Sequence, residues 1–147
     1  MALFTTLEIS GSALAAERAR AEIVASNLAN AETTRTAAGG PFRRKMAVFS
    51  GAGASTFRLL LAGYNKLTGQ PAGSVRLVDV VEDKTAPVVR YEPGHPDADA
   101  SGFVSYPNIN PIQEMVDLTG AVRAYQLNAS AVTASKQMIQ QSLDILK

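Results

Sequence analysis

The segment from Pro111 to Lys147 carries the longest regular pattern in the sequence, with no further proline and a single glycine, Gly120. Mostly apolar residues recur in it at alternating steps of three and four, which is a heptad pattern. A helix over residues 112–147 would be about 54 Å long at 1.5 Å per residue, longer than a small domain is wide. So narrow an apolar line needs a partner helix along most of its length. We call this line the C-terminal seam; its positions are Met115, Leu118, Val122, Tyr125, Ala129, Val132, Lys136, Ile139, Leu143 and Leu146.

The first thirty residues repeat the alternation of threes and fours more weakly, since Gly11 and Arg18 fall on seam positions. Asn30 is a plausible end for this helix, because asparagine tolerates left-handed backbone geometry. We therefore expect an α+β chain with two long terminal helices. They would form a coiled-coil-like pair, or pack on copies from neighbouring chains, with a small β-rich domain inserted between them. The N-terminal seam comprises Phe4, Leu7, Gly11, Leu14, Arg18, Ala21, Ala25 and Leu28.

We expect residues 1–34 and 107–147 to form the helical core, and residues 35–106 to form the inserted β-rich and extended segment. Strands are expected at 42–50, 74–81 and 88–91, in one small antiparallel sheet. The apolar run 56–62 is strand or helix, because periodicity does not distinguish them. Residues 92–111 are expected to be extended, because their prolines resist both helix and central strand.

The long C-terminal helix has clear start signals. Asn110 fits the N-cap, Pro111 the first helical position, and Glu114 the first turn, where a carboxylate complements the helix dipole. Each terminal helix alone buries too little surface to offset the entropy of ordering it. In an isolated monomer we therefore expect mobile ends, up to about Thr33 and from about Asn110 onward.

The charge and composition exclude several classes of protein. The net charge of +1 gives no global attraction to nucleic acid or membrane, and we interpret Arg43-Arg44-Lys45 as a solvated strand or loop face. The chain has no cysteine, which excludes disulfides, thiolate metal sites and cysteine nucleophiles. No stretch approaches eighteen apolar residues, so no membrane-spanning helix is expected. Residues 1–17 hold no basic residue, so we expect no cleaved secretory signal.

The only histidine, His95, lies close to Asp97 and Asp99 in a His-x-Asp-x-Asp spacing. This spacing could hold a metal, but aspartates that hydrogen-bond nearby backbone amides in a turn are the favoured interpretation. Nucleophile elbows and phosphate-binding loops are absent from the sequence. We therefore expect no catalytic residue, no metal, no cofactor and no small-molecule substrate.

Two residues of the C-terminal seam stand out. Lys136 interrupts it, and a lone polar residue there can set register or partner choice, or can simply extend to the edge of the interface. Both interpretations stay open. Tyr125 is expected to pack in a core with its hydroxyl at the rim.

Three segments together resemble one protein family. Ser26-Asn27-Leu28-Ala29-Asn30 is similar to the Asn-Leu-Ala-Asn signature near the start of bacterial flagellar axial proteins. The stretch from Tyr91 through Asp99 and Gly102-Phe103-Val104 to Pro107-Asn108-Ile109-Asn110-Pro111 resembles a segment of the proximal-rod proteins of the flagellar basal body. Glu114-Met115-Val116-Asp117 and Ala124-Tyr125-Gln126 resemble the C-terminal helix of the same proteins. Residues 51–73 are longer than the connection that the resemblance leads us to expect.

The resemblance implies a structural subunit of the proximal rod, located in the basal body within the periplasm. Such subunits assemble with copies of themselves and with other rod proteins into a shaft that transmits torque from motor to hook. They leave the cell through the flagellar type III export apparatus. Nucleic acid is not an expected partner. The two seams, rather than the resemblance, provide the expected subunit-interface residues, which are Leu7, Leu14, Leu28, Met115, Leu118, Val122, Tyr125, Val132, Ile139, Leu143 and Leu146.

Two other functions stay open beside this one. The chain could be a helical adaptor of an export system that captures a partner helix on its seam. A small hydrolase that uses His95 and Asp97 is the more remote possibility.

Overall fold

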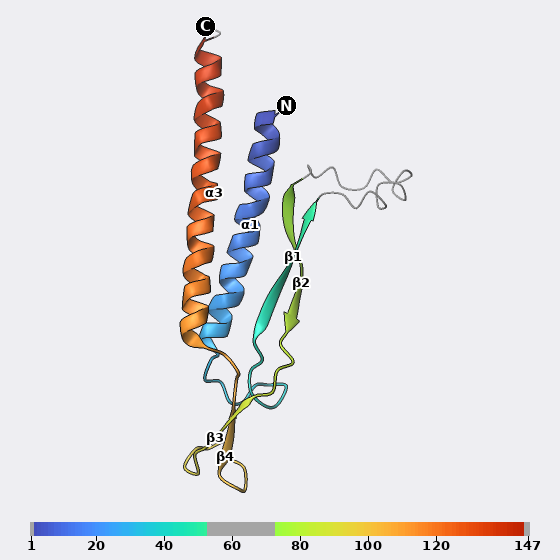
Figure 1. Cartoon of the computed structure of the whole chain (residues 1–147), viewed down its shortest axis with the longest axis vertical. Helices are drawn as coiled ribbons and strands as arrows, with labels where there is room; N and C mark the ends of the chain where they lie inside the picture. The colour runs from blue at the N-terminus through green and yellow to red at the C-terminus, as the bar shows by residue number, and fades with distance from the viewer. Residues whose placement is uncertain (1, 53–72, 146–147) are drawn as a thin grey trace, which may run out of the picture. The chain divides into compact units, whose positions relative to one another are not determined.

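The computed structural model describes residues 2–52 and 73–145. The elements follow in the order α1 (Ala2–Ala29), β1 (Lys45–Ala52), β2 (Ser74–Glu82), β3 (Val88–Tyr91), β4 (Phe103–Tyr106) and α3 (Pro111–Ile145), as Figure 1 shows. The prediction of an α+β chain with long helices near its ends and strands between them is confirmed. The apolar run 56–62 and the seam residue Leu146 lie outside the described residues.

The strands form two separate two-stranded sheets, β1 with β2 and β3 with β4. The prediction of a single sheet is therefore wrong. After β2, the Asp83 carboxylate accepts a hydrogen bond from the Thr85 N–H, which turns the chain. Pro87 then stands directly before β3 and has no N–H to continue a ladder. β3 then pairs with β4 and not with β1 or β2.

β3 and β4 pair antiparallel with Val88 opposite Tyr106 and Tyr91 opposite Phe103. The sequence predicts that residues 92–111 are extended but predicts no strand within them; in the structure Phe103–Tyr106 forms one. No proline falls inside this short segment, so its N–H groups remain free to pair. Gly102, with a φ of 81°, begins the return of the chain just before it. Val104 lies on the covered face of this sheet and is almost completely buried.

The helix boundaries agree with the local sequence signals. α1 ends at Ala29, and the Asn30 side chain then donates a 2.9 Å hydrogen bond to the Ser26 carbonyl. α3 begins at Pro111, and the Ile112 N–H donates to Asn110 Oδ1 at 3.1 Å. The predicted N-cap at Asn110 is confirmed. β1 starts three residues later than expected, at Lys45; just before it, the Phe42 N–H donates to the Thr33 carbonyl across the preceding loop.

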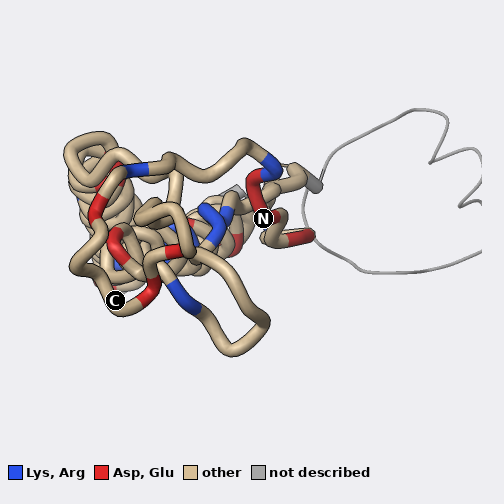
Figure 2. Tube along the Cα trace, turned by 90° about the horizontal axis from the view of Figure 1, so that it is seen from below, with Lys and Arg blue, Asp and Glu red and all other residues tan. Residues whose placement is uncertain are grey.

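The chain divides into two compact units. One combines the described parts of residues 1–19, 49–78 and 121–147, and the other combines residues 20–48 and 79–120. Few large apolar side chains are buried in the part of the chain that the structure describes. Figure 2 shows acidic and basic positions interspersed along the trace. Among the described residues, no helix has the length and hydropathy needed to cross a membrane. The buried side chains of the described residues are Ser10, Ala16, Val24, Asn27, Ser74, Val104, Pro107, Glu114, Ala121 and Ser135.

Candidate functional site

Asn27, from the Asn-Leu-Ala-Asn segment near the end of α1, bonds the backbone where β1 begins. Its Oδ1 accepts the Lys45 N–H at 2.8 Å, and its Nδ2 donates to the Lys45 carbonyl at 2.8 Å. One carboxamide thus satisfies both backbone groups of a single residue, as a neighbouring strand would. The same Nδ2 also donates to Glu114 Oε2 at 3.1 Å, so Asn27 ties α1 to both β1 and the first turn of α3.

Glu114 is only 1% exposed and is the largest fully buried side chain of the described residues. Its second oxygen, Oε1, accepts a 2.7 Å charge-assisted hydrogen bond from Arg44 Nε. Arg44 Nη2 also lies 3.8 Å from Asp117 Oδ2, one turn further along α3. We call Asn27, Arg44, Lys45, Glu114 and Asp117 the Glu114 cluster. The interpretation of Arg44 as a solvated cation is wrong, because its guanidinium neutralises this buried carboxylate.

The residues after α1 close the loop that leads to the Glu114 cluster. The Thr33 hydroxyl donates to Asn30 Oδ1 at 3.1 Å, and the Thr33 N–H donates to the Asn30 carbonyl. Asn27 and Asn30 therefore have different tasks: Asn27 joins three elements, whereas Asn30 ends the helix and shapes the loop. Within the same segment, Ser26 and Leu28 are half-buried and Ala29 is exposed.

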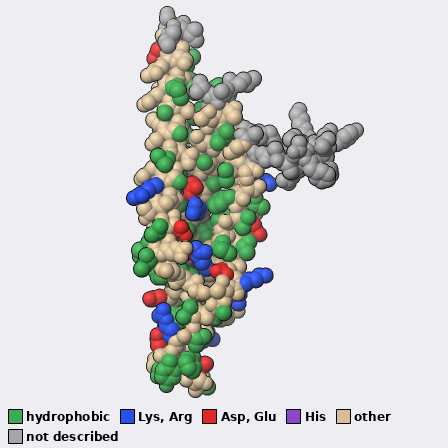
Figure 3. All heavy atoms as spheres, in the orientation of Figure 1, with side chains coloured by type: hydrophobic (Ala, Val, Ile, Leu, Met, Phe, Trp, Pro, Cys, Tyr) green, Lys and Arg blue, Asp and Glu red, His purple; other side chains and the backbone are tan. Residues whose placement is uncertain are grey.

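Along α3, two lines of side chains run one residue apart. The inner line comprises Glu114, Ala121, Asn128 and Ser135, which are spaced by seven residues; Asn128 is half-buried and the others are buried. The outer line comprises Met115, Val122, Ala129, Lys136 and Leu143, at the same spacing. Met115 is 54% exposed and Leu143 is 58% exposed, and Figure 3 shows hydrophobic side chains at the surface along α3. The small and polar line is thus inside, and the larger apolar line is outside.

The predicted interface residues therefore fall into two groups. Of those on α3, Met115, Val122, Tyr125 and Leu143 are exposed, and Leu118, Val132 and Ile139 are half-buried. Tyr125 is 43% exposed in the single chain, so its packing in a core stays a prediction for the assembled state. On α1, Leu7, Leu14 and Leu28 are half-buried.

The segment around His95 forms a network of turns. The Asp97 N–H donates to His95 Nδ1 at 3.1 Å, and Asp97 Oδ2 accepts the Thr34 hydroxyl at 2.7 Å. Asp99 Oδ1 accepts the N–H groups of Ser101 and Phe103, which confirms the turn-forming role expected for this carboxylate. Within residues 2–52 and 73–145, no group of three or more His, Asp or Glu side chains is placed to hold a metal ion.

Aromatic and charged side chains of β3 and β4 stiffen the same region. The Tyr106 hydroxyl donates to Glu92 Oε2 at 2.7 Å, and this hydrogen bond raises the pKa of Tyr106. The Arg90 guanidinium lies 4.8 Å from the centre of the Tyr106 ring. On the opposite, exposed face, the rings of Tyr91 and Phe103 meet edge to face at 5.3 Å.

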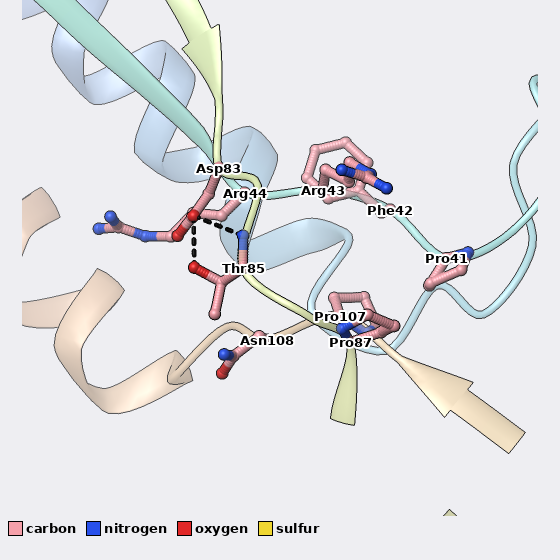
Figure 4. A pocket seen from close by; sticks show the side chains of 9 residues that line it. All are labelled: Pro41, Phe42, Arg43, Arg44, Asp83, Thr85, Pro87, Pro107 and Asn108. Carbon is pink, nitrogen blue, oxygen red and sulfur yellow. Dashed lines mark hydrogen bonds between the residues drawn. The ribbon is translucent and has the colours of Figure 1, made fainter. Parts of the chain in front are cut away.

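A small pocket lies between the residues before β1 and those around Pro107. Its volume of about 20 Å³ is room for roughly one water molecule. Figure 4 shows Pro87 and Pro107 side by side beneath Asp83, whose carboxylate accepts both the N–H and the hydroxyl of Thr85. These two hydrogen bonds lower the pKa of Asp83. Pro107 is buried and Asn108 is exposed, so this part of the predicted family motif supports the turn rather than offering a ligand cavity.

Comparison with known proteins identifies the family. A family model described as flagella basal body rod protein matches residues 7–35, and a model described as flagellar basal body rod FlgEFG protein C-terminal matches residues 100–145. The flagellar basal-body rod protein FlgC of Bacillus subtilis is 38% identical over 151 aligned residues, which cover all of both chains. The chain belongs to the FlgC family. FlgC of Escherichia coli O157:H7 is 37% identical over 99% of this chain and 98% of its own, and FlgC of Borreliella burgdorferi is 33% identical over 100% and 99%.

The two segments matched by the rod family models supply opposite sides of the Glu114 cluster. Asn27 lies in the first segment, Glu114 and Asp117 lie in the second, and Arg44 and Lys45 lie between them. Asn27 stands out in the sequence as part of the signature segment, whereas Glu114 has an ordinary explanation as a carboxylate in the first turn of a helix. The spacing of Glu114 from Ala121 and Ser135 was the available signal, because it places the carboxylate on a line of small residues rather than on the solvated side.

Proposed function

We propose that this member of the FlgC family is a structural subunit of the flagellar basal-body rod, and that it assembles with copies of itself and with other rod proteins. In the complete rod, within the periplasm, it would help to transmit torque from motor to hook. The flagellar type III apparatus would export it. Its task is mechanical, so it needs neither catalytic residue nor cofactor.

The outer line of α3 carries the structural argument for this proposal. Large apolar side chains such as Met115 and Leu143 stand exposed at heptad spacing, while the adjacent inner line is filled by smaller and polar residues. Fully burying a side chain of this size contributes about 2 kcal/mol. The outer line would therefore gain free energy when a helix of another subunit covers it, in coiled-coil-like packing with the terminal helices of the rod.

A matched pair of substitutions tests the proposal. Leu143→Asp places a carboxylate on the outer line, whereas Gln140→Asp places one at an exposed position three residues earlier, beside the outer line but not on it. Since both residues are exposed in the single chain, neither change should unfold the subunit. In the rod, an unpaired carboxylate in place of a buried leucine costs several kcal/mol at every copy.

The assays are swimming motility and electron microscopy of purified basal bodies. We expect Leu143→Asp protein to be soluble and exported, with no completed rod, and Gln140→Asp cells to swim. Met115→Asp repeats the test near the start of α3. If both outer-line variants build normal rods, the outer line is not the assembly surface.

A helical adaptor of the export system is the alternative, because an exposed apolar line also fits a single captured helix. The same microscopy separates the two functions. Density for this chain in the shaft supports a rod subunit. Stable one-to-one complexes in solution, with no density in the shaft, support an adaptor.

A further inference from the structure

We propose that the Glu114 cluster is a clasp that keeps the end of α1, the start of β1 and the first turns of α3 folded together in the free subunit. This inference goes beyond assembly, because it concerns the chain before it meets any other rod protein. It also changes which residues are expected to be ordered in the monomer. The signature segment around Asn27 and the first turns of α3 belong to the folded body, whereas the seams alone predict mobile ends up to Thr33 and from Asn110.

The first reason is that every partner of the buried carboxylate comes from a different element. Glu114 Oε2 accepts from Asn27 on α1, and Glu114 Oε1 accepts from Arg44, which precedes β1. A buried carboxylate that loses its cation or its hydrogen bonds is strongly unfavourable. If the end of α1 or the start of β1 detached while the rest stayed folded, Glu114 would lose the hydrogen bond from Asn27 or the cation of Arg44, so the three elements should open together.

The second reason is the double use of the Asn27 side chain. Its two bonds to Lys45 satisfy the N–H and carbonyl of the first residue of β1. If the end of α1 frayed, the cluster would lose these two hydrogen bonds and also the bond from Asn27 to Glu114. Three hydrogen bonds thus depend on one side chain that is only 1% exposed. The backbone of β1 and the carboxylate of α3 are coupled through it.

The third reason is that the cluster lies wholly within one compact unit. All five residues fall in residues 20–48 and 79–120. The same unit contains β3 and β4 with the buried Val104. The clasp therefore joins helix ends to a body that has its own sheet and turn network, and this body supplies the order that a lone helix end lacks.

Hydrogen exchange on the purified full-length monomer tests the clasp. In the wild-type chain we expect protected amides in 24–29, 45–48 and 114–119. Arg44→Met should lower protection in all three segments together, by about ten- to a hundredfold, because it leaves the Glu114 carboxylate without its cation. Glu32→Gln, which changes an exposed carboxylate just after α1, is the matched control and should leave protection unchanged.

The double variant Arg44→Met with Glu114→Gln distinguishes a clasp from ordinary loss of packing. The double variant has no buried charge to leave unpaired. The factor by which it loses amide protection should therefore be smaller than the product of the factors for the two single variants. A multiplicative loss would overturn the proposal. So would a loss confined to 45–48 in Arg44→Met, with the other two segments unaffected.

If Arg44→Met unfolds the entire chain, the same hydrogen-exchange measurement on Arg44→Lys tests the clasp instead. This substitution keeps the positive charge but removes the Nε donor, so it should give a smaller loss that is still shared by all three segments. A loss restricted to the segment around residue 44 contradicts the clasp. None of these measurements involves a rod, so their failure would leave the proposed assembly through the outer line untouched.

Discussion

Gly102→Ala is the substitution whose cost the structure specifies most completely. Gly102 adopts a φ of 81°, a conformation that residues with a Cβ rarely take. A Cβ built there lies 2.9 Å from Tyr91 Cε2 and 3.2 Å from Pro93 Cβ. The site is therefore both conformationally strained and crowded. Its carbonyl accepts the Glu92 N–H at 2.9 Å, so any shift also weakens the end of the β3–β4 ladder.

The two contributions can be estimated separately. A positive φ costs a non-glycine residue about 1–2 kcal/mol. Relieving the overlap adds about 1–2 kcal/mol, because the exposed Tyr91 ring can rotate away from Phe103 but the Pro93 ring is tied to its backbone. The total of about 2–4 kcal/mol is a large share of the roughly 5–15 kcal/mol that stabilises a typical domain. At about 3 °C per kcal/mol for a chain of this length, the Tm should fall by about 6–12 °C.

Alanine substitutions at two other glycines separate the backbone strain from the steric overlap. The measurement is thermal and urea unfolding of the purified subunit. Gly39 has a φ of 85° and no atom within 4 Å of a built Cβ, so Gly39→Ala should cost only the strain of about 1–2 kcal/mol. Gly94 has neither strain nor crowding, so Gly94→Ala should change stability by less than about 1 kcal/mol. We expect the loss of stability to be largest for Gly102→Ala, smaller for Gly39→Ala and smallest for Gly94→Ala. If Gly102→Ala costs no more than Gly39→Ala, the contacts with Tyr91 and Pro93 do not constrain the turn.

Three further predictions concern single polar groups. The buried Ser74 Oγ has no hydrogen-bond partner among the described residues, so Ser74→Ala should raise the free energy of unfolding by about 0.5–1 kcal/mol in urea titration. Asn110→Ala removes the N-cap of α3 and should cost about 1 kcal/mol, whereas Asn110→Asp should restore most of it. The hydrogen bonds from Thr85 lower the folded-state pKa of Asp83, so this pair contributes stability above the ordinary aspartate pKa of 3.8, and the contribution is lost as the pH falls through the lowered value. Thr85→Val should therefore raise the Asp83 pKa in an NMR titration; an unchanged value would contradict the assignment.

Local signals in the sequence were sufficient for most element boundaries. The Asn110-Pro111 pair places the start of α3, and Asn30 places the end of α1, because capping depends on a few neighbouring side chains. β4 was missed because the surrounding prolines dominated the interpretation of residues 92–111. Its formation depends on register with β3 and on the return of the chain at Gly102, which neighbouring residues do not reveal.

The Glu114 cluster was beyond sequence reasoning for a different reason. Asn27, Arg44 and Glu114 are far apart in the chain, and a carboxylate in the first turn of a helix has an ordinary explanation in the helix dipole. The heptad spacing from Ala121 and Ser135 points to the covered side, but only the structure shows that Glu114 is buried against Asn27 and Arg44. Likewise, the heptad pattern identified the apolar line of α3 but not whether this chain or another molecule covers it. In the structure, the neighbouring line of smaller residues is the buried one.

The one-residue offset between the inner and outer lines restricts how the length of α3 can change. Deleting a residue near Gly120 would rotate everything that follows by about 100°. Val122 and Leu143 would then move into the places of Ala121 and its heptad equivalents, and Ser135 would leave the covered side. Deleting or inserting seven residues instead shifts the end of the helix by about 10 Å and leaves both lines in place. A helix with two such faces can therefore lengthen or shorten only by steps close to a whole number of turns, such as a heptad.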